Sequence, residues 1–370
     1  MPTTSAGLTE GDFPLTPNPA PTAPDERARL MEAPSFGTVF TDHMARATWR
    51  EGDGWGDRGV VPFEHLRIHP GASGLNYGQQ VFEGFKAYRG DDGVIRLMRP
   101  AENARRFRAS AARIALPELS EADFLAATEG VVKADRDWVP TTEGSSLYLR
   151  PLLYGAEGWL AVRPSRVAEF ALLASPVGPY FPGGVKPISV WVAQGFHRAV
   201  VGGTGEAKAG GNYGAAMLPQ RQAEENGCDQ VLFLDAATRE FVEELGAMNL
   251  FVVFKDGSVA TPHLTGTILE GVVRDSVLAL LRASGHEVSE RRVGIDELRE
   301  GTESGEVTEM FACGTAAAIV PVGRLVSPTF DVSVGDGEPG ELTMSVRERL
   351  MGIQYGRVED EFGWMRVVAP

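Results

Sequence analysis

The chain has 370 residues, which is enough for roughly two domains with a large buried core. Its 50 acidic residues outnumber its 35 lysines and arginines. The resulting net charge of −15 argues against nucleic acid as a partner, because phosphate binding needs a basic surface. Only two cysteines are present, which excludes a disulfide-rich secreted scaffold, and no metal site is expected.

The first 30 residues contain six prolines and few large apolar side chains. We therefore predict that residues 1–30 form a flexible arm. They lack the basic start and the apolar middle of a signal peptide. No run in the sequence reaches the length of a membrane-spanning helix. We therefore expect a cytoplasmic protein without membrane contact.

The N-terminal half mixes predicted strands and helices. Phe63–His69 alternates apolar and polar residues, which predicts a half-buried strand. Ser120, with an acidic residue three positions later, is typical of a capped helix start. Ser146–Leu153 predicts a further strand, in which Pro151 would mark a sheet edge or a bulge. The apolar face expected for the helix is Phe124, Ala127, Val131 and Val132.

Residues 179–187 are rich in proline and glycine and are predicted to link two domains, 31–178 and 188–370. In the larger C-terminal domain, Asn249–Pro262 predicts a hairpin and Gly271–Ala283 predicts an amphipathic helix. Neither half shows the regular βαβ alternation of a doubly wound sheet. The predicted fold class is therefore mixed α/β in two domains.

Three motif matches are weak. His65 and His69 have an HxxxH spacing, but zinc ligation at that spacing needs a helix, and the alternation there predicts a strand. Residues 71–75 (GASGL) lack the second glycine of a GxSxG motif. The run 202–208 (GGTGEAK) lacks the GK[ST] end of a phosphate-binding loop, so it does not indicate a nucleotide site.

Lys208 is the lysine for which the sequence offers no structural explanation. It lies among glycines in Val201–Gly214 (VGGTGEAKAGGNYG), and a backbone with so little side-chain bulk can approach a planar ligand closely. A Schiff base needs a lysine amine that is close to an aldehyde and deprotonated part of the time. From the residues alone, a cofactor lysine and a solvated loop lysine both stay open.

Eight sequence blocks follow one another in the order found in a known family. They are FGTVFTDHM (36–44), YGQQVFEGFKAY (77–88), SLYLRP (146–151), VGPYFPGG (177–184), AVVGGTGEAKAGGNY (199–213), EELGAMNLF (243–251), TILEGVVR (267–274) and FACGTAA (311–317). With them the chain resembles the branched-chain-amino-acid aminotransferases, which are fold type IV (class IV) enzymes that use pyridoxal 5′-phosphate (PLP). The resemblance implies a two-domain fold of that type. It begins near Phe36, so the proline-rich arm lies outside it.

The resemblance implies a cofactor role for each matching position. Lys208 would form the internal aldimine with PLP and shuttle the proton. Glu244 would pair with the pyridine nitrogen, so that the ring can accept carbanion density, and Tyr213 would hydrogen-bond the phenolate oxygen. The neighbouring Glu243 is interpreted as a surface carboxylate. A helix start after Gly271 independently suits a dianion. The positions implied for the phosphate and its surroundings are Arg106, Arg198, Val272, Val273 and Thr315.

The resemblance also implies one pocket for an apolar substrate and for glutamate. We predict that Arg150 and Tyr77 hold the γ-carboxylate of glutamate, while the backbone near Ala247 and Ala316 receives the α-carboxylate. Without the family, such an aromatic set would be interpreted as core. The matching positions are Phe36, Tyr77, Phe82, Tyr148, Arg150, Val162, Tyr180, Ala247, Met248 and Ala316. Leu160 and Val162 match a loop that closes over the partner subunit's site, which implies a homodimer.

The implied activity is ping-pong transamination from leucine, isoleucine or valine to 2-oxoglutarate. Two other enzymes of this fold type, a D-amino-acid aminotransferase and aminodeoxychorismate lyase, are alternatives, as is a non-catalytic PLP-binding protein. The EGFKAY and GGNYG blocks favour the branched-chain group. Two departures concern Ala247, where mammalian relatives have threonine, and Ala317 with Val320, where they have a CxxC redox switch. We therefore predict no thiol regulation of that kind.

Overall fold

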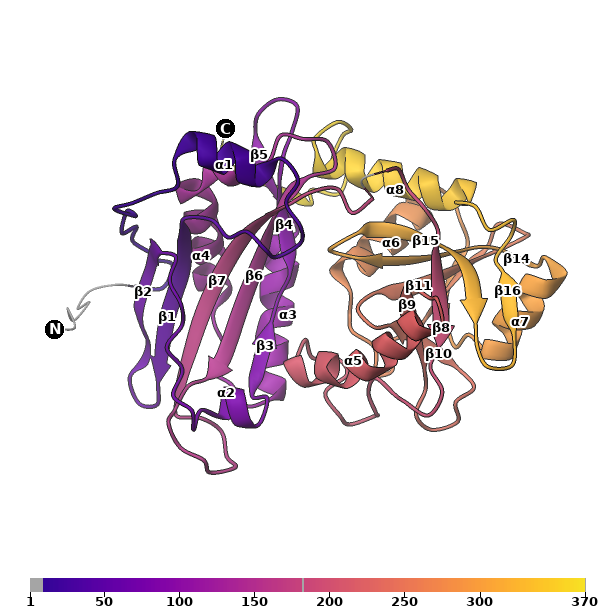
Figure 1. Ribbon diagram of the computed structural model, residues 1–370, viewed down its shortest axis with the longest axis horizontal. Coiled ribbons are helices and arrows are strands. Elements are labelled where there is room, and N and C mark those ends of the chain that lie inside the picture. Colours follow the sequence, from indigo (N-terminus) through magenta and orange to yellow (C-terminus); the bar gives the residue numbers. More distant parts are fainter. Residues whose placement is uncertain (1–8, 182, 370) are drawn as a thin grey trace. The chain divides into compact units, whose positions relative to one another are not determined.

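The structure is a computed structural model that describes residues 9–181 and 183–369 (Figure 1). The chain divides into two compact units. Unit 1 comprises Met1–Tyr180, Ala207–Gly210 and Ile353–Pro370, and unit 2 comprises Phe181–Glu206 and Gly211–Gly352. Each unit combines sheet and helices, which confirms the mixed α/β fold class.

The described residues of unit 1 form an eight-stranded sheet in the order β17-β5-β4-β6-β7-β1-β2, with β3 also paired to β6. Each of these pairings is antiparallel. The strands are β1 (His43–Arg50), β2 (Gly54–Pro62), β3 (Gln80–Phe82), β4 (Phe85–Arg89), β5 (Ile95–Met98), β6 (Ser146–Gly155), β7 (Val167–Val177) and β17 (Met365–Ala369). Two short elements, α2 (Ser73–Asn76) and a 3-10 turn (Arg136–Trp138), lie in the connections.

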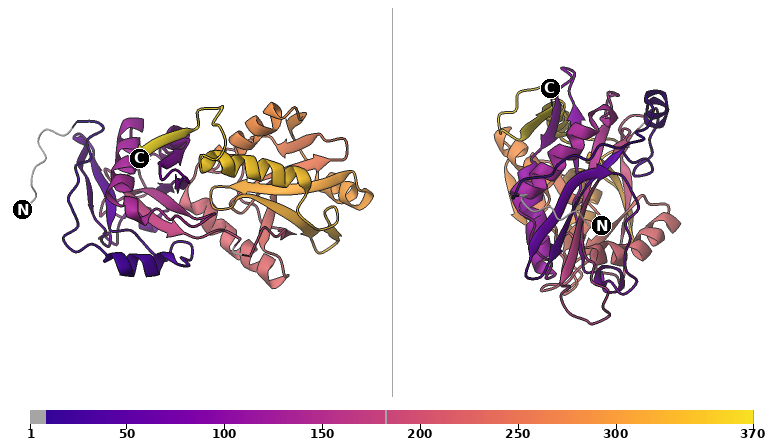
Figure 2. Two further views of the ribbon diagram at one scale, coloured as in Figure 1. Left: turned by 90° about the horizontal axis from the view of Figure 1, so that it is seen from above. Right: turned by 90° about the vertical axis from the view of Figure 1, so that its left-hand side faces the viewer.

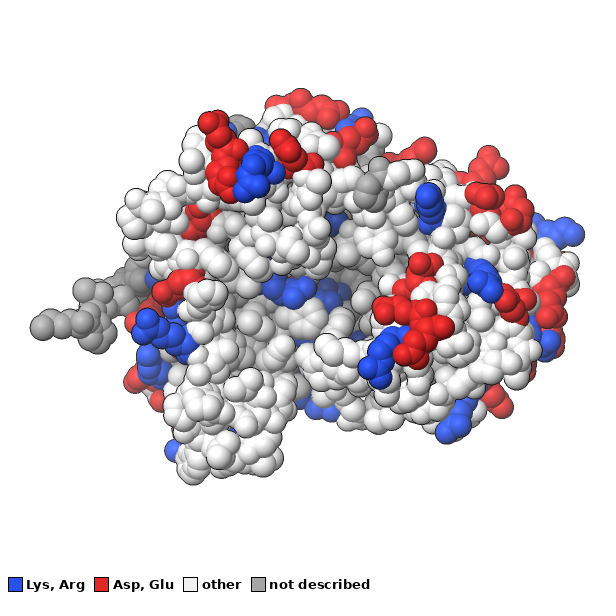
Figure 3. Space-filling model, in the orientation of Figure 1, with Lys and Arg blue, Asp and Glu red and all other residues white. Residues whose placement is uncertain are grey.

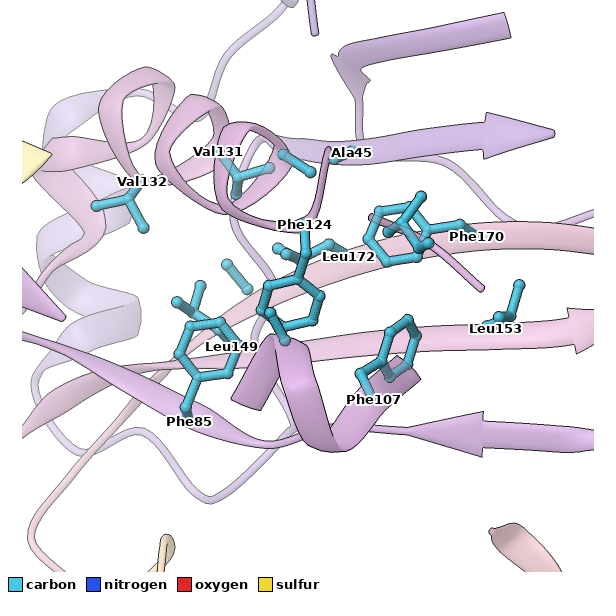
Figure 4. Packing of buried hydrophobic residues seen from close by; sticks show 14 of the residues in the cluster. Ala45, Phe85, Phe107, Phe124, Val131, Val132, Leu149, Leu153, Phe170 and Leu172 are labelled. Carbon is cyan, nitrogen blue, oxygen red and sulfur yellow. The ribbon is translucent and has the colours of Figure 1, made fainter. Parts of the chain in front are cut away.

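Two helices, α3 (Pro100–Arg113) and α4 (Glu121–Ala134), pack against this sheet, with α4 against β1 and β7. The Ser120 side chain accepts a hydrogen bond from the Asp123 amide at 3.1 Å, which confirms the predicted helix start. The four apolar residues predicted to face inward are all buried. Figure 4 shows Phe124 between the sheet and α3, with its ring centroid 5.6 Å from that of Phe85 and 5.5 Å from that of Phe107.

The strand predicted at Ser146–Leu153 is confirmed as β6, but two other expectations in unit 1 are corrected. Strand β2 ends at Pro62, and Phe63–His69 is not a strand, because the alternating segment finds no neighbour to pair with. Pro151 lies inside β6 rather than at a sheet edge. Its carbonyl accepts a hydrogen bond from the Glu83 amide at 2.9 Å. Its nitrogen points to the same side of β6, toward the break between β3 and β4, where the regular pairing with β6 is interrupted. The missing N–H therefore breaks no regular ladder bond.

The described part of the predicted arm packs against unit 1, which corrects the prediction of a flexible arm for residues 9–30. The Thr16 amide donates to the Val60 carbonyl at 2.8 Å, and the Asn18 amide donates to Nε2 of His43 at 3.0 Å. Helix α1 (Pro24–Met31) follows. These bonds join positions far apart in sequence, so composition could not reveal them. Residues 1–8 lie outside the described residues.

The described residues of unit 2 form a nine-stranded mixed sheet in the order β10-β9-β8-β15-β14-β11-β12-β13, with β16 paired to β15. The predicted hairpin is confirmed as β11 and β12, with Gly257 at φ +83° in the turn. The strands are β8 (Ile188–Val192), β9 (Gln230–Leu234), β10 (Val242–Leu245), β11 (Asn249–Phe254), β12 (Val259–Pro262), β13 (Val288–Arg291), β14 (Val307–Gly314), β15 (Ala318–Val326) and β16 (Asp331–Ser333).

Among the residues described, four helices accompany the sheet of unit 2: α5 (Gly210–Glu225), α6 (Val272–Ala283), α7 (Ile295–Ser304) and α8 (Glu341–Gln354). Helix α6 confirms the predicted amphipathic helix, and Val277, Leu280 and Leu281 on its inner face are buried. Helix α8 lies along β15 in both figures that show the whole ribbon, and Arg347 donates to the carbonyls of Ala317 and Ile319.

The division between Tyr180 and Phe181 falls within the predicted linker 179–187. Two segments group with unit 1 although the sequence prediction assigned them to the C-terminal domain. Ile353–Pro370 returns to unit 1 because β17 pairs with β5, as the yellow strand in Figure 2 shows. Ala207–Gly210 groups there because Ala209 bridges to Val81. The lysine singled out by the sequence therefore belongs to unit 1.

On the face drawn in Figure 3, acidic and basic side chains are interspersed. The ion pairs of the structure include surface pairs such as Arg299 with Glu300 at 2.9 Å. Pairs of this kind are each worth at most about 1 kcal/mol, because water screens them. Within the residues described, no helix is both long and apolar enough to cross a membrane.

Candidate active site

The segment carrying Lys208 is held on unit 1 by its backbone. The Phe82 amide donates to the Lys208 carbonyl at 3.0 Å, and the Lys208 amide donates to Oγ of Ser110 at 2.9 Å. Ser110 is buried on α3, and Ala209 bridges to Val81 on β3. Because both backbone polar groups of Lys208 have fixed partners, the direction of its side chain is set by β3 and α3.

The ring of Phe82 brings an amine and a guanidinium together. Nζ of Lys208 lies 4.8 Å from the ring centroid, and Cζ of Arg150 lies at the same distance, 4.8 Å, from that centroid. A cation at this distance is attracted by the ring quadrupole. The structure therefore joins three of the residues predicted from the sequence, which come from β3, β6 and the 207–210 segment.

Arg150 has a buried hydrogen-bond donor without a partner. It lies two residues after Tyr148 on β6, on the same face, and its Nη2 donates to the Tyr148 hydroxyl at 2.9 Å. Its Nε is buried and has no hydrogen-bond partner. Among the residues that the structure describes, no ion pair to Arg150 is found. An unsatisfied buried donor is costly, and a carboxylate at this position would satisfy it.

Tyr148 is fixed by close packing. Its ring meets that of Phe36 edge-on at 4.8 Å. A Cβ on Gly84 would lie 2.1 Å from the Tyr148 hydroxyl oxygen, so only glycine fits there. The sequence block EGF thus places a glycine where the predicted substrate residue needs room.

Four other predicted substrate residues of unit 1 are partly or largely exposed: Phe36, Tyr77, Val162 and Tyr180. The Tyr77 hydroxyl donates to the Leu160 carbonyl at 2.6 Å. Its proton is therefore engaged, so contact with a substrate carboxylate would require that bond to be exchanged. Val162 is 84% exposed in this chain.

Arg106 is buried on α3, and its partner is a residue that sequence reasoning missed. Its Nε and Nη2 donate to the two carboxylate oxygens of Glu83, at 2.7 and 2.9 Å. Glu83 was the one charged side chain in the apolar run from Val81 to Phe85, which is the signal that could have singled it out.

In unit 2, Glu244 is a buried carboxylate on β10 that accepts from Leu269, Arg198 and Asn249. Its Oε1 accepts from the Leu269 amide and pairs with Nη1 of Arg198, both at 2.9 Å. Its Oε2 accepts from Nδ2 of Asn249 at 3.3 Å. The structure thus places Arg198, predicted near the phosphate, beside Glu244. Arg198 also donates to the Thr267 carbonyl at 2.7 Å.

Glu243, interpreted from the sequence as a surface carboxylate, is buried, and that interpretation is wrong. Successive strand residues point to opposite faces, and both faces of β10 are covered. Glu243 accepts a hydrogen bond from the Thr267 hydroxyl. Burial raises the pKa of its carboxyl above the ordinary value, against the lowering effect of that bond and of Arg198.

Helix α6 begins at Val272 and Val273, as predicted, and its N-cap Gly271 offers no side-chain cap. A Cβ on Gly271 would collide with Oδ1 of Asn249, so a larger residue here would force the Asn249 side chain to move. The first amides and the helix dipole suit an anion. The other predicted residues of unit 2 are Tyr213 in the first turn of α5, Ala247 and Met248 before β11, and Thr315 and Ala316 between β14 and β15.

Comparison with known proteins identifies the family. The model of the amino-transferase class IV family matches residues 80–325. The probable branched-chain-amino-acid aminotransferase of Streptomyces coelicolor is 47% identical over 363 residues, which cover 98% of this chain and 100% of that protein.

Solved structures agree. The branched-chain amino acid aminotransferase of Escherichia coli has a TM-score of 0.72 and 28% identity, covering 88% of this chain and 99% of that one. The branched-chain amino acid aminotransferase of Thermobaculum terrenum, solved in its PLP-form, has a TM-score of 0.73 and 26% identity, covering 89% of this chain and 99% of that one. Class IV aminotransferases depend on pyridoxal phosphate. The chain therefore belongs to the class IV aminotransferases, in the group of the branched-chain-amino-acid aminotransferases.

Proposed function

We propose that this enzyme moves the amino group of leucine, isoleucine or valine to 2-oxoglutarate, with pyridoxal 5′-phosphate bound through Lys208. The observation that carries the proposal is the shared Phe82 ring, which brings the Lys208 amine and the Arg150 guanidinium to one place. An amine can bond to the aldehyde of the cofactor, and a guanidinium can bind a substrate carboxylate.

The residues present fit the cofactor. Glu244 is a buried carboxylate, which suits a protonated ring nitrogen, and the start of α6 suits a phosphate dianion. When bound, pyridoxal phosphate supplies an aldehyde for the amino group and a protonated ring that accepts the electron pair released at Cα. The proposed contacts are Lys208, Glu244 and Tyr213 for the aldehyde and ring, and Arg106, Arg198, Val272, Val273 and Thr315 for the phosphate and its surroundings.

Lys208 would act as the base once the substrate amine has displaced it. Its free amine would accept the proton from Cα of the substrate, which only a deprotonated amine can do. Ser110 and Phe82 hold its backbone on both sides, so the side chain would return to the same position in each half-reaction. Such positioning lowers the entropic part of the barrier.

Two chemically different substrates would use one pocket in turn, in a ping-pong sequence. Phe36, Phe82 and Tyr148 offer apolar surface for a branched side chain. Arg150 would receive the γ-carboxylate of glutamate through its unsatisfied Nε. Tyr77 would join it after exchange of its bond to Leu160. The other proposed substrate contacts are Val162, Tyr180, Ala247, Met248 and Ala316.

We further propose that two copies of the chain associate. Trp159, Leu160 and Val162 lie in the connection between β6 and β7, and each exposes half or more of its side chain. A group of exposed apolar residues is typical of an interaction site. Sedimentation velocity of the purified enzyme would detect the dimer, and a monomer at micromolar concentration would contradict it.

A half-reaction tests the proposed activity. Holoenzyme mixed with L-leucine, without any 2-oxo acid, should lose the visible absorbance of its cofactor, and added 2-oxoglutarate should restore it. The Lys208→Ala variant should show no turnover while its far-UV circular dichroism stays unchanged. Normal turnover by this variant, or reaction with D-alanine in place of L-leucine, would contradict the proposal.

A further inference from the structure

Glu83 is a fully buried carboxylate at the junction between β3 and β4, with 0% of its surface exposed. Its Oε1 accepts from Nε of Arg106 at 2.7 Å. Its Oε2 accepts from Nη2 of Arg106 at 2.9 Å, from Nδ2 of Asn103 at 2.8 Å and from the Gly84 amide at 3.0 Å. Four hydrogen bonds therefore converge on one side chain.

The carboxyl of Glu83 is ionised at neutral pH. Burial raises its pKa, but the charge and hydrogen bonds of Arg106, the charge of Lys208 and the bond from Asn103 outweigh burial, so that the pKa lies below its ordinary value. Burying an ion pair brings little net stability compared with apolar residues of similar volume. Stability alone therefore does not account for a charge pair at this position.

One face of α3 connects this pair to the lysine segment. Asn103, Arg106 and Ser110 are three and four residues apart, so they share a face. Asn103 and Arg106 donate to Glu83, while Ser110 accepts from the Lys208 amide. On the other side, Phe82, which precedes Glu83, donates to the Lys208 carbonyl. Glu83 thus lies within the set of bonds that orients both Arg106 and the Lys208 backbone.

We propose that Glu83 is a positioning residue that holds the Arg106 guanidinium in one orientation for the phosphate of the cofactor. The inference rests on the proposed function, in which Arg106 contacts that phosphate. Two parallel bonds along one edge of a guanidinium fix its plane, and hence the direction of its third nitrogen, Nη1. Glutamine in place of Glu83 would offer one acceptor and one donor, and its donor would face the donors of Arg106 and Asn103.

The test compares two ligands that differ only in the phosphate. Apo-enzyme of the Glu83→Gln variant is titrated with pyridoxal 5′-phosphate and, separately, with pyridoxal, and binding is followed by absorbance. We expect the affinity for pyridoxal phosphate to fall about tenfold or more, as for loss of a charge-assisted hydrogen bond, and the affinity for pyridoxal to stay within about threefold. Equal losses for both ligands, or no loss, would overturn the proposal.

Three further variants sharpen the result. Glu169→Gln, which neutralises a carboxyl on β7 bonded to Thr48, should change neither affinity. If Glu83→Gln does not fold, Asn103→Ala is used instead, because it removes one donor to Glu83 and leaves the charge pair. A smaller loss of affinity that is restricted to pyridoxal phosphate supports the inference. An unchanged ratio of the affinities for pyridoxal phosphate and pyridoxal overturns it. Arg106→Gln distinguishes the proposed phosphate contact from the positioning role of Glu83. If Arg106→Gln keeps the preference for pyridoxal phosphate over pyridoxal, the proposed phosphate contact is wrong. If Arg106→Gln loses this preference but Glu83→Gln keeps it, the positioning role is wrong.

Discussion

Replacing Arg150 with methionine removes a guanidinium while keeping a long apolar side chain over the Phe82 ring. In the wild-type structure, Nε of Arg150 is buried without a partner, and Nη2 already serves the Tyr148 hydroxyl. A bound γ-carboxylate would therefore gain one hydrogen bond from Nε and one from a terminal nitrogen of the same guanidinium. Hydrogen bonds to charged groups contribute about 1.5–3 kcal/mol each. A net loss of about 3 kcal/mol corresponds to roughly a hundredfold, since 1.4 kcal/mol is tenfold.

Steady-state kinetics with each amino donor measures this loss. We expect kcat/KM of Arg150→Met to fall about a hundredfold for glutamate and at most about threefold for leucine, because only glutamate carries a second carboxylate. Arg357→Met is the matched control: this arginine also lies over an aromatic ring, 5.2 Å from that of Tyr355, but pairs with Asp91 and Glu143. Equal losses for glutamate and leucine in Arg150→Met would refute the shared-pocket reasoning.

Three further outcomes are expected. Glu244→Gln should lower kcat at least about a hundredfold, since a neutral amide cannot stabilise a protonated ring nitrogen, with unchanged circular dichroism; an unaffected rate would remove Glu244 from the reaction. Burial raises the pKa of the Cys313 thiol to about 12, so it stays protonated at pH 8 and should resist alkylation until the protein unfolds, as peptide mass spectrometry can follow. Burial raises the pKa of Asp235, but hydrogen bonds from Thr238, Phe241 and Glu240 lower it to about 2. Because this pKa lies below the ordinary 3.8, the stabilisation is present above that value and is lost as pH falls toward 2. Asp235→Asn should thus cost about 1 kcal/mol at pH 7 in urea unfolding, as for loss of a cap, and the difference should shrink as pH falls toward 2; a pH-independent difference would contradict the assignment.

Local features of the fold were readable from the sequence. The helix after Ser120 and the hairpin at residues 249–262 depend on a cap and a turn glycine, which act within a few residues. The helix after Gly271 depends on an apolar stripe of period 3.6. The strand predicted at Phe63–His69 failed because a strand also needs a neighbour, and no pattern within one segment supplies it.

Among the site residues, too, some could be predicted from the sequence and others could not. Lys208 could be singled out by its glycine-rich surroundings, and the family resemblance supplied Glu244, Arg106 and Arg150 as matching positions. Glu83 escaped notice, and Glu243 was misplaced on the surface, because burial is a property of the folded sheet. The partner of the Lys208 amide, Ser110, lies 98 positions earlier in the chain.

The sequence by itself thus determined the mixed α/β class and the family, and it singled out Lys208 as the predicted cofactor lysine, because glycines, caps and ordered motif blocks act locally or by direct comparison. Only the tertiary structure decided that Lys208 is held by unit 1, that its amine and Arg150 share the Phe82 ring, and that Glu83 binds Arg106. These relations depend on which strands and helices meet, and long-range pairing is set by packing of the whole core rather than by the residues on either side of a position.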